Sequence, residues 1–171
     1  MKTLSLLAAA LVPSCQLIPS DLLSVEARAI VFEDAGGDLS DIGREDIDLA
    51  GYGLHGAIMT GIVDVVGGIE LREFENEDSP ELDIGLRKRL FGIWKLQPYI
   101  EANWRYGFDL DTQTRSEDYF GYNVGVGALI DINGTYFLNF RAMYDNTSID
   151  VTNGDVDVEG VIGTVGIGLK F

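Results

Sequence analysis

Cysteine, histidine, proline and basic residues are all scarce in this chain of 171 residues. It contains one cysteine, one histidine and four prolines, and its 12 basic residues stand against 28 acidic ones. A lone cysteine rules out a disulfide framework. The formal net charge of −16 argues against nucleic acid as a partner, because contacts to phosphate groups need lysine and arginine.

The chain also has no apolar run at its start that is long enough for a membrane helix. Leu4–Val12 spans roughly nine residues, whereas a transmembrane helix needs about 20. After the basic Lys2, this run predicts a secretory signal peptide over residues 1–20, followed by one domain over residues 21–171. Cys15, in the segment Val12-Pro13-Ser14-Cys15, is placed as in the lipobox of bacterial lipoproteins. The sequence leaves open whether Cys15 is acylated or discarded with the signal.

What the chain does have is glycine and apolar residues, at 21 glycines and 46% hydrophobic residues, which does not fit a disordered chain. No long stretch follows the helical period, but segments of roughly ten residues alternate between apolar and polar or small residues, as strands do. We expect eight strands, at about 24–33, 47–60, 62–74, 81–90, 96–108, 119–131, 135–145 and 160–171.

The residue composition of the two strand faces indicates which face is turned inward. One face is broad, apolar and rich in aromatic residues, and the other carries glycines with charges of both signs. A membrane barrel has lipid outside and a narrow polar interior, which fits this division. An even number of eight strands suits a barrel whose interior is just filled by side chains. We expect an interior polar network of Glu26, Arg28, Asp64, Glu70, Arg72, Asp83, Arg87, Glu101, Arg105 and Arg141.

The connections between the expected strands alternate between long and short. The long ones are expected at 34–46, 73–81, 108–118 and 145–159, and the short ones include the Asn133-Gly134 turn. Outer-membrane barrels alternate long external loops with short periplasmic turns in this way. The four long spans hold 19 of the 28 acidic residues and only two basic ones, so we expect a nearly neutral barrel with acidic extracellular loops.

The last strand ends in Thr164-Val165-Gly166-Ile167-Gly168-Leu169-Lys170-Phe171. This octet resembles the C-terminal signal that the assembly machinery reads in bacterial outer-membrane barrels. The resemblance assigns the assembly signal to Thr164, Gly166, Leu169 and Phe171.

From about Ser24 to Phe171 the chain resembles the small eight-stranded outer-membrane barrels of the OmpA/OmpX type. The resemblance rests on strand number, loop alternation and the terminal octet, and no local motif identifies one member. It implies an all-β fold, an eight-stranded antiparallel transmembrane β-barrel with up-and-down meander topology. It also implies the outer membrane of a Gram-negative bacterium as location, with outer-membrane lipid, lipopolysaccharide and the barrel-assembly machinery as partners.

Candidate chemistry is sparse, and we expect no enzyme and no cofactor. His55, the single histidine, could serve as the base of a lipid-modifying enzyme, but no serine follows Ser148, where such enzymes carry theirs. The acidic segments at Asp109–Asp111 and Asn153–Glu159 lack a complete calcium-loop spacing, so no dedicated metal site is expected. Diffuse divalent cations at these acidic loops, bridging to lipopolysaccharide phosphates, stay open.

These observations favour a structural or surface-interaction role for a barrel whose interior is plugged by paired charges. Two alternatives from other classes remain open. The first is a narrow channel or a transport barrel for small molecules, and the second is a lipid-modifying outer-membrane enzyme. A soluble secreted β-barrel is a third reading, which recovery without detergent would favour.

Overall fold

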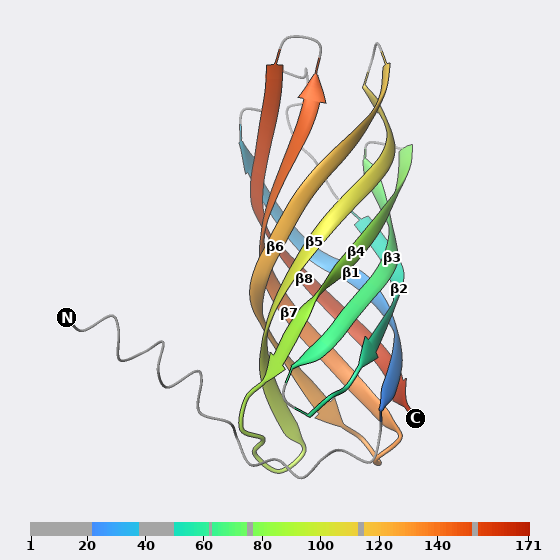
Figure 1. Ribbon diagram of the computed structural model, residues 1–171, viewed down its shortest axis with the longest axis vertical. Helices are drawn as coiled ribbons and strands as arrows, with labels where there is room; N and C mark the ends of the chain where they lie inside the picture. Colours follow the sequence, from blue (N-terminus) through green and yellow to red (C-terminus); the bar gives the residue numbers. More distant parts are fainter. Residues whose placement is uncertain (1–21, 38–49, 62, 75–76, 113–114, 152–153) are drawn as a thin grey trace, which may run out of the picture.

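The computed structural model describes residues 22–37, 50–61, 63–74, 77–112, 115–151 and 154–171. These residues form eight strands in an up-and-down order around a closed barrel, and β8 pairs with β1 to complete the ring (Figure 1). The predicted eight-stranded antiparallel barrel is confirmed. No helix among the described residues is long and apolar enough to cross a membrane. The strands are β1 (Leu23–Gly37), β2 (Ala50–Ile58), β3 (Asp64–Phe74), β4 (Glu77–Arg89), β5 (Leu96–Thr112), β6 (Arg115–Asp131), β7 (Tyr136–Val151) and β8 (Gly154–Lys170).

Side chains alternate between the outside and the inside of the barrel, because successive residues of a strand point to opposite faces. On β6, Val124 and Val126 are 48% and 58% exposed, whereas Asn123, directly before Val124, is 3% exposed. The same division holds on β5, where Trp104 is 56% exposed and Arg105 is 2% exposed. The outer surface is therefore apolar and the interior is polar.

Aromatic rings in the interior lie over glycines on the neighbouring strand. Tyr119 is directly opposite Gly107, and a Cβ atom on that glycine would collide with the tyrosine ring. Three further pairs have the same arrangement, which explains why so many glycines fall on the inward face. They are His55 with Gly68, Tyr99 with Gly127, and Phe137 with Gly168.

We call the end of the barrel that holds the C-terminus the turn end. There the chain reverses tightly, and glycines take the positive φ angles that two of the turns require: Gly61 at 86° and Gly134 at 85°. The side chains of Asp131 and Asn133 accept backbone N–H groups within the β6–β7 turn, from Gly134 at 2.6 Å and Tyr136 at 3.0 Å respectively. The predicted turn at Asn133-Gly134 is confirmed.

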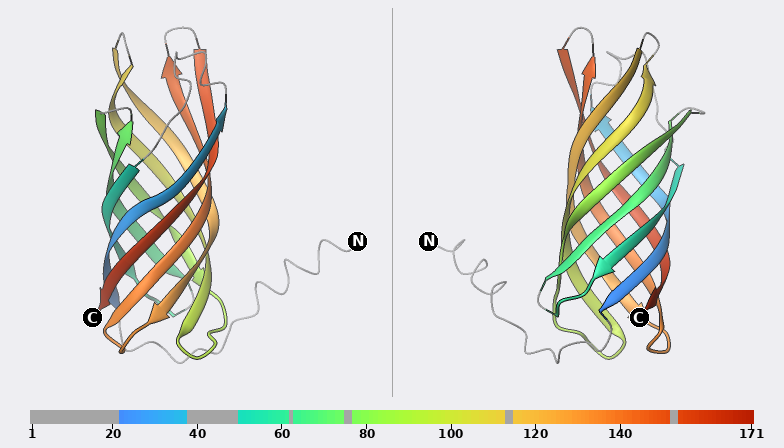
Figure 2. Two further views of the ribbon diagram at one scale, coloured as in Figure 1. Left: turned by 180° about the vertical axis from the view of Figure 1, so that it is seen from behind. Right: turned by 45° about the vertical axis from the view of Figure 1, so that its right-hand side comes forward.

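At the opposite end, which we call the hairpin end, the strands continue further than predicted (Figure 2). Pairing runs to Phe74↔Glu77, Thr112↔Arg115 and Val151↔Gly154. Three of the four expected long loops are therefore mostly paired strand, and that part of the prediction is wrong. Acidic residues are dense in these segments, which favours loops over strands, although residues 155–159 alternate between acidic residues and valine as a strand does.

The β1–β2 side of the hairpin end differs from the rest of the barrel. β2 pairs with β1 only as far as Ala29↔Tyr52, whereas β1 continues along β8 to Gly37↔Val158. A register shift between Ile30 and Phe32 accompanies this change. Of the expected loop at 34–46, residues 38–46 lie outside the described part of the chain, as do residues 1–21 with the signal peptide and Cys15.

Candidate functional site: the charged interior of the barrel

All ten charged residues singled out in the sequence point into the barrel. Nine are buried, and the Asp83 side chain is 6% exposed. The structure adds Glu81, Arg89 and Asp145 to this set. The interior of the described residues thus holds seven carboxylates, six guanidinium groups and one imidazole. The carboxylates are Glu26, Asp64, Glu70, Glu81, Asp83, Glu101 and Asp145, and the guanidinium groups are Arg28, Arg72, Arg87, Arg89, Arg105 and Arg141.

At the turn end of the interior, Asp64 pairs with two arginines of β4. Its Oδ2 atom is 3.3 Å from Arg87 Nε and 3.0 Å from Arg89 Nε, and its Oδ1 atom accepts a hydrogen bond from Arg89 Nη2 at 3.1 Å. β3 and β4 are neighbours in register there, with Asp64 opposite Arg87. This cluster ties two adjacent strands together.

Further along the interior, the pairs join strands that are not neighbours in the sheet. Glu26 on β1 pairs with Arg28 and accepts a hydrogen bond from Asn139 Nδ2 on β7 at 2.8 Å. Arg141 on β7 donates to Glu101 on β5, with Nη1 and Oε1 3.0 Å apart. The Glu26–Asn139 and Glu101–Arg141 contacts each pass over an intervening strand, so these side chains extend into the lumen.

Toward the hairpin end, two arginines and two carboxylates form a network across the barrel. Arg105 Nη2 donates to Asp145 Oδ2 at 2.5 Å, and Glu81 Oε2 lies 3.2 Å from Arg72 Nε and 3.4 Å from Arg105 Nη1. Arg72 Nη1 is 3.7 Å from Asp145 Oδ2. Because β3 and β7 are four strands apart in a ring of eight, this last pair spans the lumen from one wall to the opposite one. Tyr119 also donates to Glu81.

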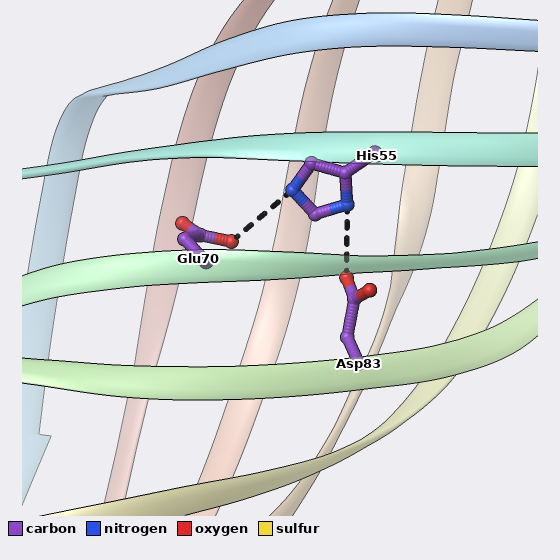
Figure 3. A group of neighbouring side chains, drawn as sticks. All are labelled: His55, Glu70 and Asp83. Carbon is purple, nitrogen blue, oxygen red and sulfur yellow. Dashed lines mark ion pairs between the residues drawn. The ribbon is translucent and has the colours of Figure 1, made fainter.

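His55 lies between two carboxylates from adjacent strands (Figure 3). Its Nδ1 atom is 3.2 Å from Asp83 Oδ2 on β4, and its Nε2 atom is 3.6 Å from Glu70 Oε2 on β3. Arg28 Nη1 on β1 is 3.1 Å from the same Nδ1 atom. A guanidinium group can only donate, so its contact with Nδ1 requires that nitrogen to accept. Asp83 faces the same atom as a second acceptor, so Arg28 and Asp83 compete for Nδ1.

His55, Glu70 and Asp83 are also the one group of metal-ligating side chains found together among the described residues. Their ligand atoms lie within 4.8 Å of one another. Each carboxylate faces a different ring nitrogen. A guanidinium group also lies next to Nδ1. The positive charge of Arg28 beside Nδ1 therefore opposes a cation at this group.

Sequence reasoning missed three of these charged residues, although the signal was present. Glu81 comes two residues before Asp83 and Arg89 two residues after Arg87, so each continues the inward parity of its strand. Asp145 comes four residues after Arg141 and so shares its inward parity, but it also begins the span 145–159 that was expected as an acidic loop. Glu81 and Asp145 are 1% and 6% exposed, so the acidic spans contribute two fewer charges to the surface than expected.

The residues assigned to the assembly signal lie on β8 and just after it. Thr164 is buried and accepts a hydrogen bond from Arg141 Nε at 3.1 Å. Gly166 faces Arg28 across the β1–β8 seam, and Leu169 pairs with Val25 there. The Phe171 ring is 64% exposed, and its backbone N–H donates to Leu23 O at 2.8 Å. That an assembly machinery reads these residues stays a prediction.

Among known proteins, neither a family model nor a curated protein matches the sequence of this chain. Solved structures do match its fold. Neisserial surface protein A matches with a TM-score of 0.63 at 15% identity, over 87% of this chain and 97% of that one. The N-terminal β-barrel domain of Pseudomonas aeruginosa OprF matches with a TM-score of 0.58 at 14% identity, over 86% and 97%.

The attachment invasion locus protein Ail of Yersinia pestis matches with a TM-score of 0.56 at 16% identity, over 87% of this chain and 97% of that one. Identities this low carry the fold and not the activity. The closed ring of eight antiparallel strands is what the chain shares with these structures. The chain therefore has the fold of the small eight-stranded outer-membrane β-barrels.

Proposed function

We propose that this chain is an integral protein of the bacterial outer membrane with a structural or surface-interaction role, in which the barrel is a closed membrane anchor. The single observation that carries the closed lumen is the contact between Arg72 on β3 and Asp145 on β7, which joins opposite walls at 3.7 Å. The apolar outer surface supports the membrane location. The closed sheet supports it as well, because it leaves no unpaired strand edge in lipid. Its partners are then outer-membrane lipid and lipopolysaccharide.

The orientation of the barrel in the membrane follows from the difference between its two ends. We place the turn end in the periplasm and the hairpin end outside the cell, where the acidic segments form the surface presented to the surroundings. The side chains of Asp109–Asp111 and of residues 153–158 lie outside the described part of the chain. Divalent cations at these acidic segments remain part of the proposal.

The proposal also holds that the chain is not an enzyme. His55 contacts Arg28, Glu70 and Asp83, and no hydroxyl group that could act as a nucleophile is among its partners in the described residues. Mass spectrometry of lipid A from cells carrying wild type or His55→Ala tests this point. Identical lipid A in both strains is expected, and a modification that depends on His55 contradicts it.

Membrane location and barrel are tested together by fractionation and gel migration. The protein should be recovered with the outer membrane and should migrate faster without heating than after heating, because a folded barrel resists the detergent of the gel. Recovery in the periplasm without detergent contradicts the proposal and favours a soluble secreted barrel.

The closed lumen is tested by conductance of the purified protein in planar bilayers. Wild type should give no steps, and the double variant Arg72→Ser with Asp145→Ser should open a measurable current, because it removes the contact across the lumen. The matched control is Val126→Ala on the outer face, which should stay closed. Conductance steps in wild type contradict the closed lumen.

A narrow channel is the second candidate, and one observation favours it. Several buried polar atoms have no hydrogen-bond partner in the described protein, among them Glu101 Oε2, Asp83 Oδ1 and Arg105 Nε. Buried polar groups are usually satisfied, and water in the lumen is one way to satisfy them. The wild-type conductance experiment separates this candidate from the closed anchor.

A further inference from the structure

The turn between β4 and β5 differs from the other described turns in the residue that takes the strained position. Ile93 and Leu96 exchange two backbone hydrogen bonds, of 2.9 and 3.0 Å, so Trp94 and Lys95 form a two-residue turn. Trp94 has a φ of 57°, and it is the one non-glycine residue with a positive φ in the described chain. Glycine takes such positions in the other two turns, at Gly61 and Gly134. A tryptophan there is held in a conformation that its side chain disfavours.

The strained turn presents an apolar tip. Trp94 is 93% exposed, and Phe91 and Ile93 beside it are 68% and 62% exposed. The tip is tied down by the neighbouring β6–β7 turn, where Asp131 N donates to Lys95 O at 2.9 Å and Lys95 Nζ donates to Ile132 O at 3.0 Å. The chain thus holds three large apolar side chains outward on a fixed turn.

The charge at the tip is positive. Lys95 Nζ lies 5.6 Å from the centre of the Trp94 ring. The carboxylate of the adjacent turn, Asp131, is paired with Lys170 at 2.7 Å. No ion pair between Lys95 and a carboxylate is present in the described residues. The tip therefore combines an indole, which favours the boundary between water and hydrocarbon, with a lysine that attracts phosphate.

We propose that the β4–β5 turn is a lipid anchor, in which Trp94 inserts into the headgroup region of the periplasmic leaflet and Lys95 binds the phosphate of an anionic phospholipid. The inference rests on the proposed membrane location. It adds a partner for one particular turn, and it gives a reason for the backbone strain at Trp94, since strain at an exposed residue persists when another interaction compensates for it.

The position of the Trp94 indole is tested with two variants, each of which keeps only one of the two tryptophans. Trp104→Phe leaves Trp94 as the sole tryptophan, and Trp94→Phe leaves Trp104, on the outward face of β5, as the matched control. In vesicles, phospholipids brominated near the headgroup should quench Trp94 more than those brominated near the chain ends. Quenching by aqueous iodide but by no brominated lipid overturns the proposal.

The same experiment separates this inference from the proposed membrane location. If Trp104 is quenched by lipid and Trp94 is not, the barrel is in the membrane and only the anchor is wrong. If neither is quenched by lipid, the membrane location itself fails. Shielding of Trp94 that depends on protein concentration and not on lipid assigns the turn to contacts between copies of the chain and overturns the anchor.

Trp94→Gly tests the proposal by the direction in which it changes the urea midpoint of unfolding. Glycine fits a φ of 57° without strain, so in a turn with no lipid contact this change should raise the urea midpoint of unfolding from vesicles. A lipid anchor predicts a lower midpoint, with Trp94→Phe close to wild type. An unchanged or raised midpoint for Trp94→Gly overturns the proposal.

The role of Lys95 is tested by lipid composition. Lys95→Gln should lower the midpoint in phosphatidylglycerol vesicles and leave it unchanged in phosphatidylcholine vesicles. Equal effects in both lipids, or no effect in either, overturn the phosphate contact.

Discussion

The two faces of the barrel wall reverse the distribution of residues found in a water-soluble protein. Among the described residues, 20 buried ones are polar or charged and nine are hydrophobic, whereas Leu54, Ile84 and Val126 on the outer face are 65%, 61% and 58% exposed. Withdrawal of apolar side chains from water into the interior therefore cannot be the main source of stability. The outer face needs an apolar solvent, and the inner face needs each charge to find an opposite charge.

A change of charge should lower the stability of the barrel for different reasons on the two faces. A charge introduced on the outer face meets lipid, whereas a charge deleted from the inner face leaves its partner buried alone. The predictions that follow use matched positions on the two faces and run from the largest expected effect to the smallest.

The largest effect is expected for removing a carboxylate from the interior. Glu101 is 2% exposed and pairs with Arg141 at 3.0 Å. Glu101→Ala leaves this guanidinium group buried without its partner, which should lower the free energy of unfolding by about 3–5 kcal/mol. Urea unfolding of the barrel from vesicles measures it. The neighbouring outward change Ile100→Ala is the control, and a loss below about 1 kcal/mol for Glu101→Ala would show that the interior solvates unpaired charges.

Removing both members of that pair should recover much of the loss. Glu101→Leu combined with Arg141→Leu leaves no buried charge at this position, and such replacements are often nearly neutral. If the double variant is less stable than Glu101→Ala alone, the interior requires these charges for packing and not only for neutrality.

The next effect is expected for placing a charge on the outer face. Val126→Arg should lower the free energy of unfolding by about 2–4 kcal/mol near the middle of the bilayer, because the guanidinium group is moved into hydrocarbon. The same vesicle unfolding assay measures it, with Val126→Leu as the larger but apolar control. A neutral Val126→Arg would mean that this face does not contact lipid.

A smaller effect is expected for the glycines that make room for interior rings. In Gly107→Ala the new methyl group meets the ring of Tyr119, and relieving the overlap should cost about 1–3 kcal/mol. Gly56→Ala is the control, since a Cβ atom there would lie 3.6 Å from its nearest neighbour, Ser24 O. Equal unfolding midpoints for the two variants would show that Tyr119 moves aside freely.

Strand number, antiparallel order and inward parity could be predicted from the sequence because each depends on a pattern with period two. The strand ends at the turn end lie close to those predicted, since glycine and Asn-Gly turns mark them. The pairing at the hairpin end, at Thr112↔Arg115 and Val151↔Gly154, was missed because the density of acidic residues there favours loops, although backbone pairing does not depend on side-chain charge.

The interior contacts divide in the same way. Parity along a strand is enough to place Glu101 and Arg141 inside the barrel. It does not reveal that Arg72 reaches Asp145, because that contact depends on the register between all the strands that separate β3 from β7. The period-two pattern identifies which side chains point into the barrel. Only the three-dimensional register identifies the strand that each of them contacts.

The smallest effect is expected for an ion pair of the same chemistry that lies in water. Asp131 and Lys170 are 2.7 Å apart at the turn end, and the Asp131 side chain is 31% exposed. The hydrogen bond from Lys170, with that from Gly134 N, holds the pKa of Asp131 below its ordinary value of 3.8. Its stabilising contribution is therefore present above pH 3.8 and is lost as the pH falls through the lower pKa of the folded state.

Asp131→Asn should accordingly cost at most about 1 kcal/mol at pH 7, because solvent screens an exposed pair. Urea midpoints of wild type and Asp131→Asn should differ slightly at pH 7 and converge in acid, where the wild-type carboxyl group becomes protonated. A loss as large as that for Glu101→Ala, or a difference that persists after protonation, would mean that the turn end is not in contact with water. The turn end would then share the water-free surroundings of the two faces of the barrel wall.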